Sequence, residues 1–155
     1  MAKVPTRSPT HADVELARLA SMGLDVEELD DGGAVPLAAL VEMAEDRGRP
    51  ASHYLAALAL ATELPLAPTP GATLTLKMCV GMCQQWGALD LADHIAENLT
   101  GGQKKTPPRK LTLVPVACLD RCDQAPACEV HGAHGQLVLA PATIASLDEA
   151  LDALT

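Results

Sequence analysis

The stretch TLTLKMCVGMC, residues 73–83, combines a strand pattern with a pair of cysteines. Leucine and methionine alternate with threonine and lysine up to Cys79, and this period of two predicts a β-strand that ends there. Cys83 follows four positions later. The stretch therefore places two thiols at the carboxyl end of a strand, where α/β proteins commonly bind ligands.

A second cysteine pair with the same spacing follows the next predicted strand. After a helix predicted over residues 88–102, the β-rich run KLTLVPVAC, residues 110–118, ends at Cys118, and Cys122 comes four positions later. Strand, helix and strand in succession form a βαβ unit, so the two strands should be parallel with both carboxyl ends at one sheet edge. Pro115 has no N–H, so the second strand should lie at an edge or carry a bulge.

The sequence pattern of the first part of the chain predicts an N-terminal helical region over residues 1–66. Apolar residues recur at helical spacing within 35–48, and a weaker helical pattern covers 11–23. Residues 51–64 are apolar on most of the helix circumference, which predicts a helix buried between neighbours. Three prolines and a glycine within residues 65–73 mark a linker.

The last part completes an α/β domain predicted over residues 72–155. Two short strands, near residues 127–130 and 136–140, can pair around the turn HGAHG. The chain closes with a helix that should carry four apolar residues on one side: Ile144, Leu147, Leu151 and Leu154. The predicted order of elements in this domain is βαβ-ββα.

Composition excludes several classes of function. The chain of 155 residues carries a net charge of −9, whereas a nucleic-acid partner requires clustered lysine and arginine. With no Phe, one Tyr and one Trp, few side chains can stack on bases or on a flavin ring. We therefore expect no nucleic-acid partner.

The protein is expected to be cytoplasmic and to have no transmembrane segment. No run approaches the roughly 20 apolar residues that span a bilayer, and residues 1–16 contain no apolar stretch typical of a signal peptide. Cytoplasmic thiol pools keep cysteines reduced, so grouped cysteines there are metal ligands or redox-active thiols more often than disulfides.

Four cysteines gathered at one sheet edge favour a metal. Neighbouring thiolates disfavour one another's ionisation, and a metal supplies the positive charge that keeps them deprotonated. Thiolates suit both a structural four-cysteine zinc site and an iron-sulfur cluster, and the spacing does not decide between them. A third hypothesis is a dithiol redox enzyme using Cys79 and Cys83, although it lacks C-x-x-C spacing and gives Cys118 and Cys122 no role.

A fifth cysteine, Cys128, lies in a predicted strand and is expected to be a small buried hydrophobe rather than a ligand. It could replace Cys79 or Cys83 as a ligand. With His131 and His134 it also forms C-x2-H-x2-H, a spacing that is irregular for zinc.

Two stretches resemble the thioredoxin-like [2Fe-2S] ferredoxin family, in particular the small iron-sulfur subunits of NADH dehydrogenase, NAD-linked formate dehydrogenase and hydrogenase. CLDRCDQAPACEVHG, residues 118–132, is similar to the family's C-x3-C, Ala-Pro, short strand and turn. Residues 36–60 are similar to the helical segment that precedes the cluster domain in those subunits. The resemblance runs from about residue 34 to the C-terminus, with a first pair of C-x3-C where the family has C-x4-C.

The resemblance implies a thioredoxin-like fold and a one-electron carrier that does no bond chemistry itself. It implies that Cys79 and Cys83 hold one iron of a [2Fe-2S] cluster and that Cys118 and Cys122 hold the other. It also implies an electron-transfer subunit whose partner is a flavin- or NAD(P)H-binding oxidoreductase subunit, with a homodimer as the alternative. The structural zinc scaffold with four cysteine ligands and the thioredoxin-like dithiol enzyme remain the alternative functions.

Overall fold

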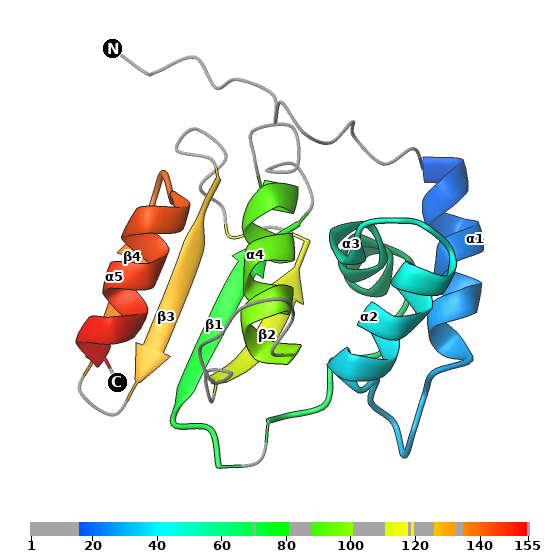
Figure 1. Cartoon of the computed structure of the whole chain (residues 1–155), viewed down its shortest axis with the longest axis horizontal. Helices are drawn as coiled ribbons and strands as arrows, with labels where there is room; N and C mark the ends of the chain where they lie inside the picture. Colours follow the sequence, from blue (N-terminus) through cyan, green and yellow to red (C-terminus); the bar gives the residue numbers. More distant parts are fainter. Residues whose placement is uncertain are drawn as a thin grey trace.

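The computed structural model describes residues 16–69, 71–80, 88–100, 111–117, 119, 126–132 and 135–154. Figure 1 shows a β-sheet with helices packed beside it. The described helices are α1 (Leu16–Glu27), α2 (Leu37–Asp46), α3 (Ala51–Ala61), α4 (Ala88–Thr100) and α5 (Ile144–Leu154). The described strands are β1 (Leu74–Cys79), β2 (Leu111–Val116), β3 (Cys128–Gly132) and β4 (Gly135–Leu139). None of these helices has the length and apolar composition needed to cross a membrane.

The strands form one sheet in the order β2-β1-β3-β4. β1 and β2 are parallel, as the βαβ unit requires, and Cys79 pairs with Val116 at their carboxyl ends. β3 is antiparallel to both β1 and β4, and Met78 pairs with Cys128. The predicted α/β fold and the order βαβ-ββα are confirmed, with β1 lying between β2 and β3.

β2 lies at one edge of the sheet, which confirms the prediction from Pro115. Proline has no N–H, so it is tolerated where a strand is paired on one side only. Pro115 pairs with Met78 of β1, and the described part of the chain places α3 rather than a strand against β2. The predicted linker, residues 65–73, also contacts β2, because the Thr69 N–H donates a hydrogen bond to Thr112 Oγ1 at 3.3 Å.

The two faces of the sheet differ in burial. In β1, Leu76 and Met78 are buried, whereas Thr75 and Lys77 are partly exposed. Figure 1 shows α4 and α5 in front of the sheet, where α4 contacts β1 and α5 contacts β3 and β4. The alternation along β1 therefore separates a helix-covered apolar face from a more polar face.

α3 is enclosed by its neighbours, as its apolar circumference predicts. It contacts α1, α2, α4 and β2, and residues 54–58 are all buried. Its first turn is held by α4, because the N–H and the hydroxyl of Ser52 both donate to the Asp93 carboxylate at 2.8 Å. The N-terminal helices and the α/β part share one apolar core. The division into residues 1–66 and 72–155 stays a prediction.

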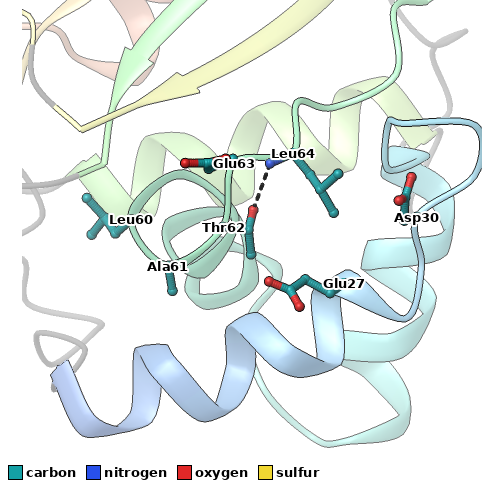
Figure 2. Close-up of a pocket in the computed structure, with 7 residues that line it drawn as sticks. All are labelled: Glu27, Asp30, Leu60, Ala61, Thr62, Glu63 and Leu64. Carbon is teal, nitrogen blue, oxygen red and sulfur yellow. Dashed lines mark hydrogen bonds between the residues drawn. The ribbon is translucent and has the colours of Figure 1, made fainter.

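The C-terminal end of α3 borders a pocket that Figure 2 shows in close-up. α3 ends at Ala61, three residues earlier than its apolar pattern predicts. The Leu64 N–H donates to Thr62 Oγ1 at 3.2 Å, the dashed line of Figure 2. Leu64 also precedes a proline, whose ring disfavours helical backbone at that position. These local constraints end the helix before its apolar pattern ends.

Gly23 lies where α1 closely approaches α3. The sequence predicts a helix that ends at this residue, but α1 continues to Glu27; the predicted start, residues 11–15, lies outside the described residues. A Cβ on Gly23 would lie 2.9 Å from Ala61 Cβ and 3.3 Å from the Ala61 carbonyl oxygen. This packing against α3 offsets the low helix propensity of glycine.

Gly23→Ala is expected to lower the free energy of unfolding by about 1–3 kcal/mol, because the added methyl overpacks the contact with α3. Alanine has the better helix propensity, so propensity alone predicts the opposite sign. Urea unfolding measures the change. Ser21→Ala, at an exposed position of α1, is the control and should change stability by less than about 0.5 kcal/mol. A more stable Gly23→Ala variant would contradict the contact.

Candidate metal centre

Cys79 is the last residue of β1 and is fully buried. Its backbone N–H donates to the carbonyl oxygen of Ala127, just before β3, at 3.4 Å. The N–H of the next residue, Val80, donates to the carbonyl oxygen of Val116, at the end of β2, at 2.8 Å. The backbone beside this thiol is therefore fixed from both sides. The Cys79 Sγ lies 3.4 Å from the carbonyl oxygen of Ala117.

The end of β2 brings both chain neighbours of Cys118 close to Cys79. Ala117, whose carbonyl oxygen faces the Cys79 thiol, immediately precedes Cys118 in the sequence. Leu119, which immediately follows Cys118, packs against the buried pair formed by Cys79 and Ala88. The two chain neighbours of Cys118 thus both lie at the Cys79 site.

Three of the four predicted ligands, Cys83, Cys118 and Cys122, lie outside the described residues, as does Met82. Within the part of the chain that the structure describes, no three His, Cys, Asp or Glu side chains are grouped so as to hold a metal ion. Of the predicted ligand set, the structure therefore places Cys79, and the full set stays a prediction.

The surroundings of Cys79 are apolar. Ala88, the first residue of α4, is buried beside it, and Leu119 packs on both. Met78, the residue before Cys79, is buried as well. Ala88, Ala117 and Leu119 are site residues that the sequence reasoning missed, because such residues carry no chemical signal of their own. Ala88 and Leu119 shield the Cys79 sulfur from water, whereas the exposed Ala117 contributes its carbonyl oxygen.

Cys128 is a buried core residue, as predicted. It pairs with Met78, and successive residues of a strand point to opposite faces, so its thiol lies on the opposite face of the sheet from that of Cys79. The two thiols accordingly belong to different buried clusters. The role of Cys128 as a replacement ligand stays a prediction. The same alternation separates Cys128 from His131, and His134 lies outside the described residues.

Burial, and secondly the neighbouring Cys79, raise the pKa of the Cys128 thiol from 9.0 to about 12. The folded protein therefore holds this proton more tightly than the unfolded chain does. The resulting stability is complete below pH 9 and is lost as the pH rises toward 12. We expect the urea midpoint to fall above pH 9, and Cys128→Ala to reduce the fall. An identical pH dependence in the variant would contradict this assignment.

One family model covers most of the chain, since the model for the thioredoxin-like [2Fe-2S] ferredoxin matches residues 30–155. The chain belongs to this family. The matched range contains the four strands described above and both cysteine pairs. A search of curated proteins gave no match to this ferredoxin.

The ferredoxin is therefore an iron-sulfur electron carrier with a thioredoxin-like α/β fold, and its family binds a [2Fe-2S] cluster. The predicted family, fold and cofactor are confirmed. The residues that the structure describes fit this cofactor, because Cys79 offers a sulfur donor of the type that such clusters use. That donor lies among apolar side chains and beside the end of β2.

Proposed function

We propose that four cysteines hold the cluster, with one iron on Cys79 and Cys83 and the other on Cys118 and Cys122. One observation carries this proposal: the Cys79 Sγ lies 3.4 Å from the carbonyl oxygen of Ala117, the residue before Cys118. Four cysteine thiolates are the usual ligands of a [2Fe-2S] cluster. When bound, the cluster supplies a one-electron redox couple.

The chain contributes position and shielding at this site. Two backbone hydrogen bonds hold the chain at Cys79. The Cys79 N–H donates to Ala127, beside β3, and the Val80 N–H donates to Val116, at the end of β2, so the position of the Cys79 side chain is fixed by the polypeptide. Ala88 and Leu119 cover it with apolar surface. Solvent exposure and hydrogen bonds at the sulfurs are among the factors that set the reduction potential of such clusters.

We further propose that the protein is the electron-transfer subunit of a cytoplasmic NAD(P)H-linked oxidoreductase, with a flavin-binding subunit as its partner. Residues 36–60 resemble the helical segment of such subunits, and residues 16–66 contain nine acidic and three basic side chains. Three of these carboxylates, Glu27, Asp30 and Glu63, line the pocket at the end of α3 (Figure 2). This charge favours a partner with a basic surface.

Purification of the tagged protein from its own cells, without oxygen, tests both parts. A brown protein with two irons and two acid-labile sulfides per chain supports the cluster. One zinc and no colour would instead indicate the zinc scaffold, and no metal with a reactive dithiol would indicate the dithiol enzyme. A co-purified flavoprotein that lets NADH bleach the cluster's visible absorbance supports the subunit role; a cluster that its bound partner cannot reduce with NADH or NADPH contradicts it.

A further inference from the structure

The pocket of Figure 2 is acidic and lies where two helices end. It has a volume of about 720 Å³ and is lined in part by Glu27, Asp30 and Glu63. α1 ends at Glu27 and α3 ends at Ala61, so both helices border the pocket with the negative ends of their dipoles. Neither helix has a basic residue in its last turn. The helix ends therefore add to the negative potential of the carboxylates.

The described residues supply no cation to this acidic pocket. Its lining contains no lysine, arginine or histidine, and none of its three carboxylates forms an ion pair within the part of the chain that the structure describes. Arg47, which follows α2, is paired with Asp25 at 2.8 Å instead. A basic side chain of another protein would thus be attracted here without displacing an existing ion pair.

An apolar groove of about 240 Å³ adjoins the acidic pocket and shares residues 62–64 with it. Apart from Thr62 and Glu63, its lining is apolar and comes from the end of α3, from residues 64–66 and from β2. Val114 and Pro115 of β2 are only partly buried, so they offer apolar surface to another protein. Together the two hollows form a two-part groove in which apolar and acidic surface lie side by side.

Hydrogen bonds fix the segment that the two hollows share. The Thr62 hydroxyl donates to the carbonyl oxygen of Leu58 at 2.7 Å and accepts from the Leu64 N–H at 3.2 Å. The Pro65 carbonyl oxygen accepts from the Val35 N–H at 2.9 Å. A surface that is already ordered loses little conformational entropy when a partner binds, so the two-part groove is suited to docking.

The apolar half of the groove lies close to the cysteine site. Pro115 comes three residues before Cys118, a distance of at most about 11 Å along an extended chain. β2 ends at Val116, which pairs with Cys79. A protein seated in the groove therefore lies beside the strand that leads to this site, which is the position that a partner exchanging electrons with the cluster requires.

We propose that the electron-exchanging partner docks in this two-part groove with a segment that carries apolar side chains next to arginine or lysine. The inference rests on the proposed electron-transfer role and specifies the docking surface and the chemistry of the partner segment. The apolar side chains occupy the groove beside β2, where they are removed from water. The basic side chains enter the acidic pocket, where three carboxylates and two helix ends attract them.

Fluorescence anisotropy of labelled peptides with the cluster-loaded, full-length protein tests this chemistry. The peptide Leu-Leu-Arg-Arg should bind with a dissociation constant at least about tenfold lower than those of Leu-Leu-Glu-Glu and Gly-Gly-Arg-Arg. Its binding should weaken as the salt concentration rises, because salt screens the attraction between charges. Failure of Leu-Leu-Arg-Arg to bind, or equal binding of the three peptides, would overturn the proposal.

Two matched pairs of variants locate the binding. Glu27 and Glu28 are neighbouring exposed residues, of which only Glu27 lines the pocket. Glu27→Lys should raise the dissociation constant of Leu-Leu-Arg-Arg by about tenfold or more, and Glu28→Lys by about twofold or less at physiological ionic strength. Val114→Ser, in the groove, should weaken binding, whereas Val138→Ser, at a residue of β4 that is 39% exposed, should not. Circular dichroism verifies folding, and equal effects within either pair would overturn the proposal.

The same glutamate variants, purified from the protein's own cells, separate this inference from the subunit role. Glu27→Lys should lose the co-purified flavoprotein, and Glu28→Lys should retain it. A flavoprotein retained by both variants would overturn docking in the two-part groove and leave the subunit role intact. The expected peptide binding, in the absence of any flavoprotein that reduces the cluster, would support the groove and contradict the subunit role.

Discussion

Cys79→Ala is expected to reduce cluster binding from two irons and two acid-labile sulfides per chain to almost none, with loss of the visible absorbance. The side chain sits at the end of the central strand, buried beside the residues that flank Cys118. Its removal leaves one iron with a missing ligand, and the described side chains packed against Cys79, those of Ala88 and Leu119, are apolar and offer no substitute. Iron and sulfide analysis after anaerobic purification measures the loss.

Cys128→Ala is the matched control for that variant. It removes the same atoms from the adjacent strand, but on the opposite face of the sheet, so the iron and sulfide content should stay at the native value. Both variants replace a buried thiol by a small apolar side chain, so both should fold, as circular dichroism can verify. Full cluster content in Cys79→Ala, or loss in Cys128→Ala alone, would contradict the proposed ligand set.

Asp93→Ala is expected to lower the free energy of unfolding by about 2–4 kcal/mol, because two hydrogen bonds to a charged group are lost. The first N–H groups of a helix have no partner within the helix, and the N-cap residue of α3, Pro50, makes no side-chain bond. The carboxylate of Asp93 takes that role from another helix. Without it, the buried Ser52 hydroxyl loses its acceptor. Urea unfolding measures the change.

Glu97→Ala serves as the control on the same helix. Glu97 is exposed and lies one turn further along α4, so its loss should change stability by less than about 0.5 kcal/mol. A double-mutant cycle of Asp93→Ala with Ser52→Ala isolates the bond to the hydroxyl. Equal effects of Asp93→Ala and Glu97→Ala, or strictly additive effects in the cycle, would show that this contact does not anchor α3.

Local patterns were sufficient to predict the elements that surround the candidate site. The alternation that ends at Cys79 gave β1, and the succession of strand, helix and strand gave the parallel β1–β2 pair. Pro115 predicted an edge strand because the missing N–H is a property of that residue alone. The choice of family came from resemblance and not from spacing, which fitted zinc equally well.

Contacts between distant parts of the chain were not predictable in this way. The sequence pattern predicts that a helix ends at Gly23, but in the structure α1 packs against Ala61 at this residue. His94 appears isolated in the sequence, but its Nε2 lies 3.0 Å from Asp148 on the last helix. Each depends on a partner dozens of positions away, and residue spacing within one element contains no information about that partner.

The hydrogen bonds at Cys79 and Val80 also bear on how the protein matures. They connect the end of β1 to residues beside β3 and at the end of β2 through main-chain groups. At least one sulfur is thereby held in place by the polypeptide itself, unlike in a zinc finger, which is unfolded until its ion binds. We therefore expect the scaffold to form first and to receive iron and sulfide afterwards.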